Sequence, residues 1–315
     1  VDLYKKLEPI ETVDRDKWLF DSHWPSLMSG ERRNDSEVLF ETRKTALQEI
    51  ITDHGLEGIY KLVETCREPI VVGGILAELL PSSMQDWEIL EKLLSYDSPK
   101  SRAVENFISV RASNSGAEWI SSALKKISRT ANSEDSISKF FMSLPFAKET
   151  WNLLESQSAE IQGRYWKASV PYIMKGEKDE IEYAVRKLIE HGRPKAAFKL
   201  CHMDFQIISS KLLVNLLDLL TSSEEEDSWP IDSHDIDDAF SALDSVAELP
   251  LSDLAMLEWR YAKILNRVGG DRGSTALHKQ LAEDPNIFVD LLQLLYKSTR
   301  EEPGEIVTRD SISED

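Results

Sequence analysis

The sequence contains very little cysteine. Its 315 residues include only Cys66 and Cys201, which lie far apart and belong to no Cys-x-x-Cys or Cys/His spacing. We therefore expect no disulfide framework, and the chain suits a reducing compartment. The six histidines form no His-Glu-x-x-His motif and no neighbouring ligand pair. The expectation is that no metal or other cofactor is bound.

Long apolar runs are also missing. The longest, PIVVGGILAELL, has twelve residues and contains Glu78, so it is too short to span a bilayer. No secretory signal peptide is recognisable, and we expect a cytoplasmic protein. The chain begins at Val1 rather than at a methionine, which indicates a piece of a larger polypeptide.

Positive charge is scarce. Lys and Arg number 37 against 56 Asp and Glu, which gives a net charge of −19. A nucleic-acid backbone requires clustered cations, and so does an anionic membrane surface, so neither is expected as the main partner. The expected partner is instead a protein, a peptide or a neighbouring domain of the same polypeptide. An adaptor with a local basic face for nucleic acid remains an alternative. Nothing indicates the oligomeric state.

Catalytic motifs are absent as well. The sequence has no Gly-x-Ser-x-Gly, and VGGDRGS at 268–274 lacks the Gly-Lys-Ser/Thr ending of a phosphate loop. DSHDIDD at 232–238 departs from the calcium-loop pattern, which places Gly sixth and Glu twelfth. We therefore expect a protein that is not an enzyme. The alternative is an all-helical enzyme whose carboxylates converge from separate helices on a metal-dependent site.

No stretch shows the sustained period-two alternation of a β-hairpin, and apolar residues recur at helical spacing, which predicts an all-α fold. Trp87, Trp119 and Trp151 are separated by 32 residues each, and each follows an acidic or hydroxyl residue near the start of an apolar-periodic run. A constant period of this length is typical of stacked repeats. It predicts an α-solenoid of antiparallel helical hairpins, with the tryptophans as packing anchors.

Prolines mark the same period. Pro69, Pro99 and Pro194 each stand where a second helix of a hairpin should begin, a position at which the missing N–H of proline is harmless. The predicted pairs of helices are 56–66 with 69–80, 84–94 with 99–110, 116–128 with 133–143, 147–155 with 158–174, and 179–191 with 194–202.

The rest of the chain divides by composition. We expect an N-terminal cap segment over 1–33, a helical-repeat array over 34–222, an acidic linker over 223–234, C-terminal helical hairpins over 235–300 and a disordered acidic tail over 301–315. Single helices are predicted at 36–53, where Gly55 provides the left-handed end, and at 206–220. The C-terminal hairpins comprise 235–249, 251–265, 274–283 and 285–296.

A few side chains are candidates for partner binding. Trp18 and Trp24 belong to an aromatic N-terminal segment that either caps the array or docks a partner. Lys195 and Lys199 lie on one hairpin with Arg193 and form a possible positive spot. Arg260 and His278 form another near the C-terminus.

The segment EIEYAVRKLIEHGRPKAAFKLCHM resembles a tetratricopeptide- or HEAT-type helical hairpin, with an apolar first helix, a glycine turn and an alanine-rich second helix. The resemblance extends over roughly 56–202, although the full tetratricopeptide pattern is missing. The C-terminal segment is also similar to helical scaffold portions of large multidomain bacterial proteins. These resemblances imply a non-enzymatic scaffold for protein–protein or interdomain interaction and transfer no functional residue.

Overall fold

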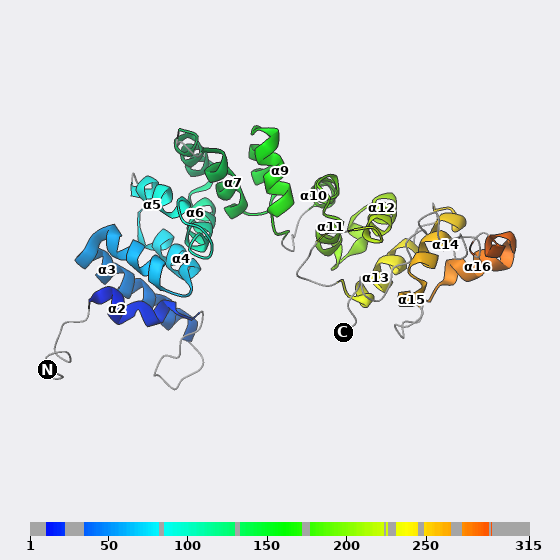
Figure 1. The fold of residues 1–315 in the computed structure, drawn as a ribbon, viewed down its shortest axis with the longest axis horizontal. Coiled ribbons are helices and arrows are strands. Elements are labelled where there is room, and N and C mark those ends of the chain that lie inside the picture. Colours follow the sequence, from blue (N-terminus) through cyan, green and yellow to red (C-terminus); the bar gives the residue numbers. More distant parts are fainter. Residues whose placement is uncertain are drawn as a thin grey trace, which may run out of the picture. The chain divides into compact units, whose positions relative to one another are not determined.

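The computed structural model describes residues 11–22, 35–81, 85–129, 133–171, 177–223, 225, 231–244, 249–265, 273–289 and 291. Within these ranges every regular element is a helix, which confirms the all-α prediction (Figure 1). Among the described helices, none has the length and apolar character needed to cross a membrane.

By internal contacts, the chain divides into two compact units. The first consists of residues 1–145 and 149–165, and the second of 146–148 and 166–315. The first unit contains α2 (Thr12–Asp16), the 3-10 helix η1 (Lys17–Phe20), α3 (Asp35–Thr65), α4 (Pro69–Leu79), α5 (Gln85–Leu94), α6 (Arg102–Ile127), α7 (Ser133–Ser143) and most of α8 (Lys148–Leu154) and α9 (Ala159–Ala168).

Helix α4 occupies the centre of the first unit and packs against both α3 and α6. It begins at Pro69 and is buried along most of its length, as the apolar run predicts. Two glycines allow α6 to approach closely, because a Cβ atom on Gly73 would stand 1.9 Å from the carbonyl oxygen of Ala103. Asn106 of α6 also donates to the carbonyl of Ile70 at 3.0 Å. Close packing of α4 against α6 at this point therefore requires glycine on α4.

Two glycines join consecutive helices without an intervening loop. Gly55 within α3 has φ 62° and ψ −155°, and Gly116 within α6 has φ 66° and ψ −159°. These dihedral angles are readily adopted only by glycine. The prediction that the helix beginning near 36 ends at Gly55 is confirmed, and so is the start of a further helix at Gly116.

The N-terminal segment is fixed against α3 by a buried arginine. Arg43 donates from Nε to the carbonyl of Leu19 at 2.9 Å and from an Nη atom to the carbonyl of Ser22 at 2.8 Å. Leu19 and Phe20 are buried. Within the described residues 11–22, this packing buries apolar side chains of the segment; the cap predicted over 1–33 stays a prediction.

In the second unit, helices that lie near one another in the sequence pack together. Its α10 packs against α11, α11 against α12, α12 against α13 and α14, and α14 against α16. The elements are α10 (Lys178–Glu190), α11 (Pro194–Cys201), η2 (Phe205–Ile207), α12 (Ser210–Leu220), α13 (Ser233–Asp244), α14 (Leu251–Arg260), α15 (Ala262–Leu265) and α16 (Thr275–Glu283).

Within the described residues, the predicted helices correspond to observed helices, with four corrections. The helix predicted over 158–174 ends at Ala168. Pro99 does not begin a helix, because a turn ending at Ser101 comes first and α6 starts at Arg102. The helix predicted from 206 begins instead at Ser210, since the Asp204 side chain accepts from the backbone of Gln206 and closes the short η2. The helix predicted over 251–265 breaks at Tyr261, which donates to the buried carbonyl of Leu217 at 2.6 Å. The helix predicted over 285–296 lies partly outside the described residues.

Candidate protein-binding groove

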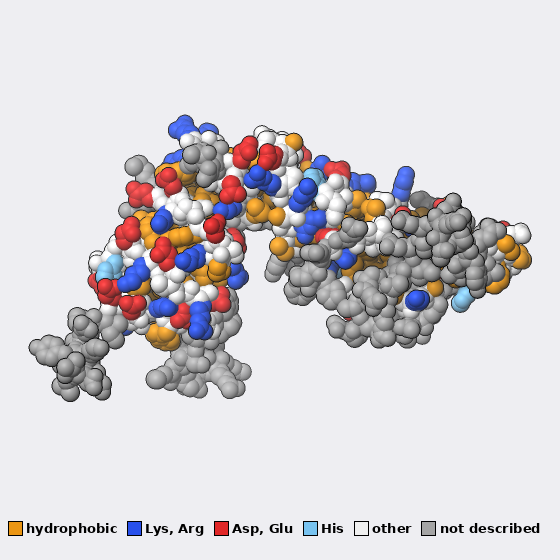
Figure 2. All heavy atoms as spheres, viewed as in Figure 1, with side chains coloured by type: hydrophobic (Ala, Val, Ile, Leu, Met, Phe, Trp, Pro, Cys, Tyr) orange, Lys and Arg blue, Asp and Glu red, His pale blue; other side chains and the backbone are white. Residues whose placement is uncertain are grey.

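A shallow groove runs between the second half of α3 and α5. Its volume is about 470 Å³ and it is open to solvent along one side. Two helices and the residue after one of them line it: Leu56, Glu57 and Tyr60 from α3, Glu88, Glu91 and Lys92 from α5, and Ser95 just beyond α5. Figure 2 shows acidic, basic and apolar side chains interspersed over the first unit on the face drawn there.

The groove follows from the apolar pattern of its two helices. In α5, Ile89, Leu90 and Leu93 are buried, so the charged residues between them face outward. In α3, Ile59 and Leu62 are buried in the same way. Each helix therefore directs its polar stripe to solvent, and the groove forms where the two stripes meet.

Tyr60 lines the groove, and Tyr96 lies beside it, next to the lining residue Ser95 and in contact with Lys92. Tyr60 is buried, and its hydroxyl lies 3.5 Å from the carbonyl of Glu88. Tyr96 donates to the Glu64 carboxylate at 2.8 Å. Burial raises the pKa of Tyr60 to about 12, and the Glu57 and Glu88 charges add to the effect. Burial, together with Glu64, raises the pKa of Tyr96 as well. Both rings thus remain neutral phenols with their hydroxyls engaged.

A cation already lies over both rings. The Lys92 ammonium is 5.8 Å from the centre of the Tyr60 ring and 5.4 Å from that of Tyr96. Aromatic faces attract cations through their quadrupole at such distances. Lys92 itself is exposed, so this contact lies at the boundary between the groove and solvent.

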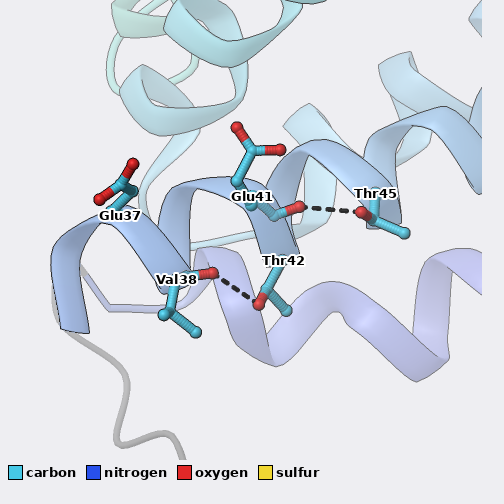
Figure 3. Close-up of a pocket in the computed structure, with 5 residues that line it drawn as sticks. All are labelled: Glu37, Val38, Glu41, Thr42 and Thr45. Atoms are coloured by element: carbon cyan, nitrogen blue, oxygen red, sulfur yellow. Dashed lines mark hydrogen bonds between the residues drawn. The ribbon is translucent and has the colours of Figure 1, made fainter. Parts of the chain in front are cut away.

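A second depression, of about 420 Å³, lies on the first half of α3. All its lining residues come from that single helix: Glu37, Val38, Glu41, Thr42 and Thr45 (Figure 3). Thr42 and Thr45 donate to the carbonyls of Val38 and Glu41 within the same helix. It has two carboxylates but no aromatic ring, which makes it a useful comparison for the groove.

The positive spot predicted around Lys195 is already occupied by Glu225. The Glu225 carboxylate accepts from the backbone N–H of Lys195 at 2.7 Å and from Arg193 Nε at 3.3 Å. Lys195 Nζ donates in turn to the Glu225 carbonyl at 2.9 Å. The Glu225 side chain is only 8% exposed. An acidic residue from the predicted linker thus caps α11 and neutralises its cations.

The other predicted binding residues that the structure describes lie on four separate elements. Trp18 on η1 is 49% exposed, and Trp24 lies outside the described residues. Lys199 is half-buried on α11. Arg260 pairs with Asp218 of α12, and His278 is exposed on α16.

Sequence reasoning missed two buried carboxylates that organise neighbouring helices. Asp86 of α5 is 5% exposed, pairs with Arg111 at 2.8 Å and accepts from Trp119 Nε1 at 2.9 Å. Glu258 of α14 is fully buried and accepts from the backbone N–H of Leu277 at the start of α16 at 2.7 Å. For Asp86, the sequence offered one signal of a structural role, because Asp86 directly precedes Trp87, one of the regularly spaced tryptophans. For Glu258, nothing in the local sequence distinguishes it from an exposed helical glutamate.

The described residues provide little for covalent or metal chemistry. Burial raises the pKa of both the Cys66 and the Cys201 thiol to about 12, so each is protonated near neutral pH. Among the described side chains, no group of three or more His, Cys, Asp or Glu is placed to hold a metal ion. The groove is consequently the candidate site that the geometry supports best.

Comparison with known proteins found no matching family model, curated protein or solved structure. The resemblance to tetratricopeptide and HEAT repeats therefore remains a prediction.

Proposed function

We propose that this chain is a non-enzymatic helical scaffold, built as an α-solenoid, that binds a protein partner in the groove between α3 and α5. The observation that carries the proposal is the groove itself. It is open, it is lined by outward-facing polar stripes of two helices, and it combines carboxylates with the Tyr60 ring, while Lys92 links it to the neighbouring Tyr96 ring. Stacked hairpins present such extended surfaces to partners.

Interactions between residues one period apart support the solenoid. Tyr96 bonds to Glu64, Lys148 lies 3.6 Å from Glu180, and Arg193 bonds to Glu225, and each pair is separated by 32 residues. This separation equals the spacing of the tryptophans. Equivalent positions in neighbouring hairpins come together when repeats stack, since each repeat contacts the next.

Site-specific photo-crosslinking tests the proposed function. We would place p-benzoylphenylalanine at Ser95, which lines the groove, or at Thr45, which lines the depression of Figure 3. Both are exposed hydroxyl residues that donate to a carbonyl of the preceding turn. In cells that make this protein, we expect discrete protein adducts at Ser95 and few at Thr45. Adducts at neither position, or equally at both, would contradict a role for the groove.

A further inference from the structure

We propose that the groove binds a lysine- or arginine-bearing segment of its protein partner, with the partner's cation placed over the Tyr60 and Tyr96 rings. This assignment names the partner chemistry of the proposed function and rests on it. Three features of the groove lead to it: its charge, its aromatic rings and its shape.

The charge of the groove is strongly one-sided. Glu57, Glu88 and Glu91 line it, and Lys92 is the one cation among its described lining residues. Glu64 lies close by, where it accepts a hydrogen bond from Tyr96. Glu57 and Glu88 act electrostatically on Tyr60, and Glu57 and Glu64 on Tyr96, so these groups share a single neighbourhood. Complementary potential favours a cationic segment and disfavours an acidic one.

The rings make the groove more than a cluster of carboxylates. Lys92 shows that an alkylammonium can lie over both rings at once, at 5.8 and 5.4 Å. Because Lys92 is exposed, moving it aside costs little, and a partner's cation can take its place. The Tyr96 hydroxyl donates to Glu64, so the hydroxyl is engaged while the ring face remains the part that attracts a cation.

The shape favours a peptide segment over a small molecule. The groove lies open between two helices rather than enclosed, and half-buried Leu56 adds an apolar contact. Small-molecule sites bury most of their ligand in a concave cavity. An extended or helical segment can instead lie along the groove and direct one long basic side chain to the rings.

Fluorescence anisotropy with a defined peptide tests the assignment. The probe is a short labelled peptide with lysine at every third position and alanine or leucine between, and its control carries glutamine for lysine. We compare Glu57→Gln/Glu88→Gln in the groove with Glu37→Gln/Glu41→Gln in the depression of Figure 3, which changes the net charge equally. We expect the lysine peptide to bind about tenfold more weakly to the groove variant and nearly unchanged to the control variant.

A second pair of variants tests the rings. Tyr96→Leu removes the aromatic face, and Tyr96→Phe keeps the face while removing the hydrogen bond to Glu64. We expect about threefold weaker binding for Tyr96→Leu and near-normal binding for Tyr96→Phe, because the ring face attracts the cation. Circular dichroism checks that both variants remain helical, and Lys92→Ala provides a variant without the competing internal cation.

The outcomes separate this assignment from the proposed function. Equal weakening by both double variants would show that the acidic protein attracts cations generally, and it would overturn the assignment. No binding of the lysine peptide by the unmodified protein at low salt would also overturn it. In either case, specific crosslinks at Ser95 would leave the protein-binding role standing. Absence of those crosslinks, in contrast, would contradict the proposed protein-binding function itself.

Discussion

The α3–α5 groove and the cationic cluster at the start of α11 carry opposite charge, and they differ in what already occupies them. At α11, Arg193 and Lys195 are bound by Glu225 from a distant part of the same chain. In the groove, the carboxylates of Glu57, Glu88 and Glu91 remain exposed. A charged cluster in a sequence therefore indicates a binding surface only when the fold leaves it without an internal partner.

This comparison predicts that the effect of removing a carboxylate on stability depends on what the carboxylate binds. Asp86 lies at one extreme because it is buried between Arg111 and Trp119. Glu225 is intermediate, and the groove carboxylates lie at the other extreme. Substitutions at the three places should reduce the free energy of unfolding by three clearly different amounts.

Asp86→Ala should have the largest effect. The side chains of Asp86 and Arg111 are 7% and 4% exposed, so the change leaves a buried guanidinium without its carboxylate. Loss of one member of a buried pair is expected to reduce the free energy of unfolding by about 3–5 kcal/mol. Urea denaturation followed by circular dichroism measures it, with exposed Glu37→Ala as the control. A loss below about 1 kcal/mol would show that Arg111 finds other compensation.

Glu225→Ala should cost less, about 2 kcal/mol, because it removes a helix cap and a partly exposed ion pair together. Arg193 is 19% exposed and can recover some hydration. Glu225→Gln is the matched variant, since its amide oxygen can still accept from the Lys195 N–H, and it should lose about half as much. Equal stability of the unmodified protein and both variants would mean that Glu225 does not hold the cluster closed.

The sequence predicted local structure better than it predicted long-range partners. The apolar run of α4, the left-handed Gly55 and the starts at Pro69 and Pro194 were all legible, because each follows from the conformational preference of the residue itself. Pro99 was misplaced, because a proline suits a turn before a helix as well as its first residue.

The candidate site was beyond reach for a different reason. Glu64 and Tyr96 are 32 residues apart and meet only in the fold, and the spacing alone does not say which side chains turn toward each other. Glu225 was assigned to a linker because acidic runs are usually solvated. Its role depends on Arg193, whose cation was itself assigned to an open surface. From the sequence alone, each member of an ion pair such as Arg193 and Glu225 is expected to be exposed, because its partner is not known.

Glu57→Gln/Glu88→Gln should have the smallest effect on stability. Both side chains are exposed, so their neutralisation should change the free energy of unfolding by no more than about 0.5 kcal/mol. A slight gain is the favoured direction, because the protein carries a net charge of −19 and loses some self-repulsion. The same denaturation experiment measures it at low and high salt. A loss above about 1 kcal/mol would show that the groove carboxylates, like Glu225, already stabilise the fold through an internal partner. The distinction between the α11 cluster, whose charges are bound within the chain, and the groove, whose charges are exposed, would then fail. The same carboxylates would serve both partner binding and stability.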